Sequence, residues 1–236
     1  MGFVYVIEHM EDDDETAKAI PPWVELEYAH MRMLAGSDAK IHFTHLSKAS
    51  RDSLSAVFVP KAGLAEANCH QVGVLDLIRQ QLGGDADALQ KVCLLDPKAE
   101  LPLSPEDGDG RFEWFLFGGI LGDDPPRDRT SELRVLGFPT RHLGPVQMTT
   151  DTALGVTKLV VSDKTPLDDI PYVVRCLASY IFAQIYPSVQ NFPTIVFNPK
   201  ESVEMPFRYI AEGSEPKLPP GMRELLHEDL NKSFDF

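Results

Sequence analysis

Residues 115–130 read FLFGGILGDDPPRDRT. An apolar run that begins at residue 112 ends on Gly118 and Gly119, and a third glycine follows at Gly122. Near-continuous apolarity is typical of a central strand in a parallel sheet, because such a strand is buried on both faces. Glycines at the end of a strand let a ligand approach the backbone closely. We therefore expect a binding loop directly after a buried strand.

Strand and helix patterns alternate on both sides of this stretch. Strands are expected at residues 3–10, 40–46, 92–96, 112–120 and 141–143, and helices at 23–34, 72–84, 128–137, 149–161 and 219–230. Residues 52–68 have the composition of a loop. The alternation predicts an α/β fold with a mostly parallel sheet and helices on both faces.

Length and composition indicate one compact domain over residues 1–236, with 43% hydrophobic and 25% charged residues. Lys plus Arg number 22 and Asp plus Glu number 36, which gives a net charge of −14. This charge disfavours tight nucleic-acid binding and attracts a basic protein partner. Taken alone, it is equally consistent with a role in solubility.

The cysteines indicate a reducing compartment, because Cys69, Cys93 and Cys176 are odd in number and form no CxxC motif. No apolar run reaches membrane-spanning length, and the N-terminus does not resemble a secretory or mitochondrial leader. We therefore expect a cytoplasmic protein with no membrane partner. His42 and His45 lie three apart on a predicted strand and face opposite sides, so no metal site is predicted.

Three loops follow three consecutive predicted strands, and each is a candidate for ligand binding. Their sequences are LLDPKA from residue 94, FGGILGDDPP from residue 117 and LGPVQMTTDTA from residue 143. In open α/β sheets, ligands bind beyond the carboxyl ends of the strands. Neither a GxxxxGK[ST] nor a GxGxxG motif opens a helix here, so a nucleoside triphosphate or a dinucleotide is not the expected ligand.

The motifs FGGILGDDPPRDRT, LGPVQMTTDTA and EMPFRY, in this order, closely resemble those of the SPOUT, or trefoil-knotted, S-adenosylmethionine-dependent methyltransferases. The VIEHM and VCLLDP segments are similar to the branch that contains a fungal enzyme modifying an arginine of a small-subunit ribosomal protein. The resemblance covers most of the chain. It implies a C-terminal trefoil knot, with the knot and the cofactor site at about residues 90–165, and S-adenosyl-L-methionine as the cofactor.

The same resemblance implies which residues would surround the cofactor, in three loops that follow three strands. They are Leu94, Leu95 and Asp96 in the first loop, Phe117, Gly118, Gly119, Ile120 and Gly122 in the second, and Leu143, Gly144, Gln147, Met148, Thr149, Thr150 and Ala153 in the third.

An arginine acceptor needs a carboxylate, which can accept two parallel hydrogen bonds from the guanidinium and hold one nitrogen in line with the methyl group. The candidate catalytic residues are Glu8, His9, Asp123 and Asp124, at a strand end or in the expected knot loop. Two alternatives stay open. The two aspartates could pair only with the neighbouring arginines 127 and 129, and the Glu8–His9 pair could simply cap the first strand.

The family pattern is interrupted once, because residues 174–191 separate the DIPYV segment from FPTIVFN. We interpret residues 172–191 as an insertion or an artefact of the gene model.

The resemblance predicts a protein-arginine N-methyltransferase acting on a small-subunit ribosomal protein, as a monomer or a homodimer. A SPOUT RNA methyltransferase and a non-catalytic acidic chaperone for a basic ribosomal protein are the alternatives. The sequence does not name the target arginine.

Overall fold

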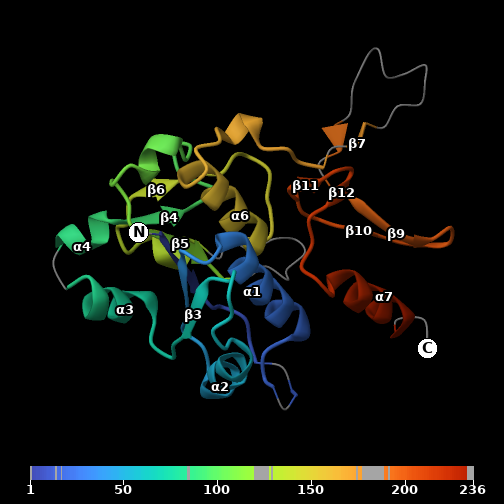
Figure 1. Cartoon of the computed structure of the whole chain (residues 1–236), viewed down its shortest axis with the longest axis horizontal. Helices are drawn as coiled ribbons and strands as arrows, with labels where there is room; N and C mark the ends of the chain where they lie inside the picture. The colour runs from blue at the N-terminus through green and yellow to red at the C-terminus, as the bar shows by residue number, and fades with distance from the viewer. Residues whose placement is uncertain are drawn as a thin grey trace.

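The computed structural model describes residues 2–232 except 14, 17, 84–85, 120–127, 129, 174, 177–188 and 191. Its centre is a six-stranded parallel sheet in the order β3-β2-β1-β5-β4-β6 (Figure 1). The strands are β1 (Val4–Glu8), β2 (Lys40–Thr44), β3 (Glu66–Cys69), β4 (Val92–Leu95), β5 (Trp114–Gly118) and β6 (Thr140–Arg141). The predicted glycine-ended strand is β5, at the middle of the sheet.

Helices cover both faces of this sheet, as the sequence predicted. They are α1 (Pro22–Ala35), α2 (Lys48–Val57), α3 (Val74–Gln81), α4 (Ala86–Gln90), α5 (Ser131–Arg134) and α6 (Thr150–Val161), with short 3₁₀ helices at Pro105–Gly108 and Leu167–Asp169. Alternate side chains of a strand point to opposite faces. Tyr5 and Ile7 accordingly join the core beneath α1, α2 and α6, whereas Val6 joins the core beneath α3, α4 and α5.

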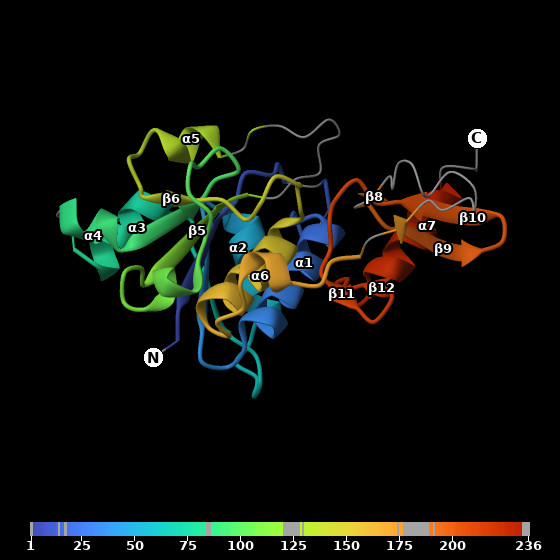
Figure 2. The same ribbon diagram turned by 90° about the horizontal axis from the view of Figure 1, so that it is seen from above.

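Helices α1 and α6 lie side by side on one face (Figures 1 and 2). His30 of α1 bonds Asp151 of α6, and a Cβ added at Gly155 of α6 would lie 3.2 Å from Leu34 of α1. From the first contact to the second, each helix continues by about one turn toward its C-terminal end. The two helices therefore run parallel to each other. This packing fixes the N-terminal end of α6 against the first half of α1.

Two parts of the secondary-structure prediction were wrong. Residues 52–68 are not a loop, because they include most of α2 and the first strand residues of β3. Helix α2 has few apolar residues, and only Ser50 and Leu54 are buried. Its start is defined instead by Ser47, whose side chain accepts a hydrogen bond from the backbone N–H of Ser50 at 3.0 Å. The helix predicted at 128–137 is limited to the four residues of α5.

The C-terminal part lies to one side of the α/β layers (Figure 2). It contains β7 (Arg175–Cys176), β8 (Val189–Gln190), β9 (Thr194–Asn198), β10 (Glu201–Glu204), β11 (Ala211–Glu212), β12 (Glu215–Pro216) and α7 (Met222–Lys232). Ile195, Met205, Phe207 and Tyr209 form a small core of their own. The assignment of residues 1–236 to one domain stays a prediction.

The segment interpreted as an insertion, residues 172–191, is only partly described. Tyr172 forms a bridge with Ile210, and β7 pairs antiparallel with β8, so the two ends of the segment lie next to each other. All of the residues between β7 and β8 lie outside the described part of the chain, as do residues 120–127 after Gly119. The insertion and the trefoil knot therefore stay predictions. In the part of the chain that the structure describes, no helix has the length and apolarity needed to cross a membrane.

Candidate functional site

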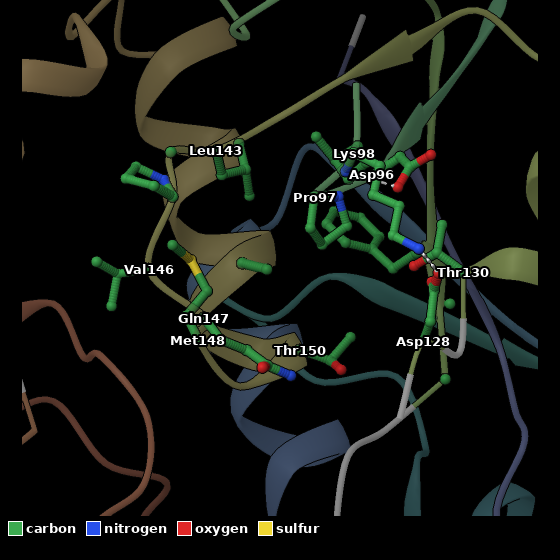
Figure 3. Close-up of a pocket in the computed structure, with 17 residues that line it drawn as sticks. Asp96, Pro97, Lys98, Asp128, Thr130, Leu143, Val146, Gln147, Met148 and Thr150 are labelled. Carbon is green, nitrogen blue, oxygen red and sulfur yellow. Dashed lines mark hydrogen bonds and ion pairs between the residues drawn. The ribbon is translucent and has the colours of Figure 1, made fainter. Parts of the chain in front are cut away.

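A cavity of about 330 Å³ lies at the carboxyl ends of β4 and β5, next to the N-terminal end of α6. Small-molecule sites typically have volumes of about 300–1,000 Å³. One wall comes from the segments after β4 and β5, and the other from the loop before α6 (Figure 3). The lining residues are Leu95, Asp96, Pro97, Lys98, Phe117, Gly118, Gly119, Asp128, Thr130, Leu143, Gly144, Pro145, Val146, Gln147, Met148, Thr150 and Ala153.

Gly119 has no space for a side chain on the side of β1. A Cβ atom at this position would lie 2.5 Å from the carbonyl oxygen of Glu8 and 2.6 Å from the backbone nitrogen of Met10. Both atoms belong to the main chain, which cannot rotate away as a side chain can. Because Gly119 also lines the cavity, this glycine lets the chain pass between the end of β1 and the cavity.

The N-terminal end of α6 offers backbone donors to the cavity. Its N-cap residue Thr149 makes no capping hydrogen bond, because its hydroxyl bonds the hydroxyl of Thr152 at 2.8 Å. The first N–H groups of a helix have no partner within the helix, and they carry a partial positive charge. The side chain of Thr150 lies at the same end, beside the cavity (Figure 3). This end suits a carboxylate or a hydroxyl-rich ligand.

Four charged residues form an ion-pair network at the opposite wall. Arg134 of α5 bonds both carboxylate oxygens of Asp96, at 2.5 and 2.7 Å, and also bonds Asp128 at 3.1 Å. The Lys98 amine bonds Asp128 at 2.6 Å. These bonds hold the pKa of Asp128 down at about 2. The network ties the loop after β4 to the segment before α5, so it fixes the width of the cavity.

The pKa of Asp128 predicts how acid affects this wall. A carboxyl group with a depressed pKa stabilises the fold above its unfolded pKa, and the stabilisation is lost as pH falls through the folded value. We therefore expect Asp128→Asn to melt below the wild type at pH 6 and the difference to shrink between about pH 4 and pH 2. Measuring the melting temperatures of both proteins by calorimetry between pH 6 and about pH 2 checks this prediction. A difference that stays constant with pH would show that ionised Asp128 does not stabilise the wall.

Most of the residues expected around the cofactor line this cavity, and two described ones do not. Leu94 is fully buried on the other face of the sheet, because it alternates with Leu95 along β4. Thr149 is engaged with Thr152. Ile120, Gly122, Asp123 and Asp124 lie outside the described residues. Pro97, Lys98, Asp128, Thr130, Pro145 and Val146 also line the cavity and were missed, although they lie within or beside the three loops that the sequence singled out.

Glu8 does not line the cavity, although it ends β1 next to Gly118. Its Oε2 atom accepts hydrogen bonds from the Thr44 hydroxyl and, at 3.0 Å, from the backbone N–H of Val74 at the start of α3. Burial raises the pKa of Glu8, and these bonds oppose the increase. Its contacts therefore connect β1, β2 and the start of α3. The role of Glu8 in catalysis stays a prediction.

His9 is buried, and its Nδ1 atom lies 2.8 Å from the hydroxyl of Tyr28 on α1. Burial lowers the pKa of His9 to about 4, so the ring is neutral at physiological pH. The Nδ1 atom of His42 lies 2.9 Å from Nε2 of His70, and the His42 ring stacks on Trp114. No group of three metal-ligating side chains occurs among the residues that the structure describes.

Comparisons with known proteins agree with these features. Residues 4–233 match the family described as protein arginine N-methyltransferase SFM1-like. Protein arginine N-methyltransferase SFM1 of Saccharomyces cerevisiae is 35% identical over 238 residues, which span 98% of this chain and 97% of the yeast protein. The crystal structure of yeast SFM1 complexed with SAM has a TM-score of 0.74 and 32% identity, covering 97% of this chain and 92% of that chain. The crystal structure of yeast SFM1 complexed with SAH has a TM-score of 0.70 and 32% identity, covering 94% of this chain and 93% of that chain.

Proposed function

Because the chain belongs to the SFM1-like family of protein arginine N-methyltransferases, we propose that it binds S-adenosyl-L-methionine in the cavity and methylates an arginine side chain of a protein. The observation that carries the proposal is the likeness to SAM-bound SFM1 along 97% of this chain. When bound, the cofactor supplies the methyl group, which forms a bond to an arginine nitrogen as the carbon–sulfur bond breaks and the guanidinium releases a proton.

The cavity fits this cofactor in three respects. Gly118 and Gly119 leave room for a ligand against the backbone. The N–H groups at the start of α6 suit a carboxylate. Leu143 and Met148 add an apolar surface for the flat adenine ring. Holding a cofactor against such a wall fixes the direction in which the methyl group points.

We further propose that the acceptor is a basic protein of the small ribosomal subunit and that the methylation occurs in the cytoplasm. The net charge of −14 supports a basic partner, and the free thiols of Cys69 and Cys93 suit a reducing compartment. Glu8, His9, Asp123 and Asp124 stay candidates for the acceptor site. The enzyme acts as a monomer or a homodimer.

Incubation with methyl-labelled S-adenosylmethionine tests the function. Purified small-subunit ribosomal proteins and ribosomal RNA are offered separately, and the labelled product is hydrolysed to its amino acids. We expect label in methylarginine of one protein and none in RNA. Transfer to RNA alone would replace the protein acceptor by a nucleic acid. S-adenosylhomocysteine binding without transfer to any protein would overturn the proposed acceptor class.

A further inference from the structure

Glu27 of α1 and Asp151 of α6 are buried acids that interact electrostatically, and each has one oxygen atom without a donor. Glu27 of α1 is 5% exposed, and Asp151 of α6 is 0% exposed. The Oε2 atom of Glu27 and the Oδ1 atom of Asp151 are buried and have no hydrogen-bond partner. A buried polar atom without a partner lowers the stability of the fold, so this arrangement calls for an explanation.

The packing of the two helices places Glu27 at the cavity end of α6. His30 contacts Asp151 in the first turn of α6, and Leu34 contacts Gly155 one turn further. Glu27 precedes His30 by about one turn, so it lies level with the residues just before α6. Those residues include Gln147 and Met148, which line the cavity.

Polar groups from α1 and from two further segments lie near the two acids. Nδ1 of His30 lies 2.7 Å from the other carboxylate oxygen of Asp151, which fixes the orientation of this side chain. The hydroxyl of Tyr209 bonds Thr149, and burial together with the charges of Asp151 and Glu27 raises the pKa of Tyr209. Glu11, three residues after the end of β1, is close enough to raise the pKa of Glu27. Two acids and a tyrosine hydroxyl thus converge beside the cavity.

We propose that Glu27 and Asp151 form the subsite that receives the guanidinium group of the acceptor arginine, a proposal that rests on the function proposed above. A guanidinium is planar and presents N–H donors in a fork. Two carboxylate oxygens on adjacent helices can accept hydrogen bonds from two guanidinium nitrogens. The third nitrogen then points toward the cavity. His30 is then a positioning residue, because it acts through Asp151. Glu11, which interacts with Glu27, is half-buried, and the next two residues, Asp12 and Asp13, are exposed at the surface.

The electrostatics of Glu27 support this assignment. Burial and the charges of Asp151 and Glu11 raise its pKa well above the ordinary value. Two like charges without a cation repel each other, and a bound guanidinium would neutralise them. Such groups lower stability in the free protein because they are arranged for a ligand.

The test compares Glu27→Gln with Glu25→Gln, a matched control on the same helix whose carboxylate pairs with the exposed Lys18. Each protein receives methylguanidinium in the presence of S-adenosylhomocysteine, and binding is measured by calorimetry. Methylammonium serves as a cation of equal charge without the planar fork. We expect the wild type and Glu25→Gln to bind methylguanidinium more tightly than methylammonium, and Glu27→Gln to lose this preference.

Transfer to protein is measured in parallel. Glu27→Gln should reduce turnover roughly a hundredfold, the size of one preorganised electrostatic group, with S-adenosylhomocysteine affinity unchanged. Asp151→Asn should show a similar loss, because Asn keeps a hydrogen-bond partner for His30 but not the charge. Wild-type turnover in Glu27→Gln would overturn the subsite and leave the proposed function standing. No transfer by the wild type would overturn the proposed function, and methylguanidinium binding would still decide the subsite.

Stability separates a binding role from a structural one. A carboxyl group with a raised pKa stabilises the fold only below that pKa, and the contribution is lost as pH rises through it. The groups that face Glu27 are Asp151 of α6, Glu11 after β1, Tyr209 before β11, and Tyr28 and His30 of α1. We expect Glu27→Gln to melt at or above the wild-type temperature at pH 8. A clear drop in melting temperature with unchanged methylguanidinium binding would show a structural role and overturn the proposal.

Discussion

Replacing Gly119 by valine is expected to abolish S-adenosylhomocysteine binding and to lower the melting temperature. The first atom of any side chain at this position would overlap the carbonyl oxygen of Glu8 and the backbone nitrogen of Met10, at 2.5 and 2.6 Å. Relief of the overlap requires the chain after β5 to move away from β1 and into the cavity. Calorimetric titration and thermal melting measure the two effects. Cofactor affinity equal to that of the wild type would remove the Gly119 loop from the site.

A graded series separates steric overlap from general damage. Gly119→Ala introduces only the clashing Cβ atom, so most of the loss should already appear in this variant. Gly155→Ala is the matched control, because its Cβ would approach only the side chains of Leu34 and Ile210, at 3.2 Å. Those side chains can shift by a few tenths of an ångström. We expect the control to retain cofactor affinity, and an equal loss in both variants would contradict the steric argument.

Replacing Arg141 by methionine is expected to destabilise the protein by about 3–5 kcal/mol, the usual cost of leaving one half of a buried ion pair without its partner. Arg141 is 6% exposed and Asp107 is 3% exposed. Two parallel hydrogen bonds join them, both at 2.9 Å. Removal of the guanidinium leaves the Asp107 charge buried. The loss is a large part of the roughly 5–15 kcal/mol that stabilises a typical domain.

Urea unfolding measures this loss, and a surface pair gives the control. Lys91 and Glu113 are at a similar distance of 2.8 Å, but both side chains are 50% exposed. Lys91→Met should therefore cost less than about 1 kcal/mol. Because β6 leads directly into the cavity loop at Leu143, Arg141→Met should also weaken S-adenosylhomocysteine binding. A loss for Arg141→Met no larger than that of Lys91→Met would show that burial of the pair does not matter.

The sequence by itself determined the layer arrangement and indicated the loops that line the cavity. Near-continuous apolar runs at β4 and β5 are produced by burial on both faces of the sheet. The amphipathic pattern of the helices is produced by burial on one face. Both patterns depend only on the spacing of apolar residues within one strand or one helix, so a short stretch of sequence is enough to recognise them. Glycines at the end of β5 and the loop before α6 likewise indicated where a ligand can approach, and both segments line the cavity.

Only the tertiary structure decided which side chains meet there. Asp96 and Arg134 are 38 residues apart, and His30 and Asp151 are 121 residues apart, so no local pattern relates them. Glu8 ends a strand as expected, but its carboxylate turns to α3 because Val74 offers an N–H group there. Glu27 looks in the sequence like one of several helix acids. It is buried beside Asp151 only because α1 packs parallel to α6, and such packing depends on the whole sheet beneath both helices.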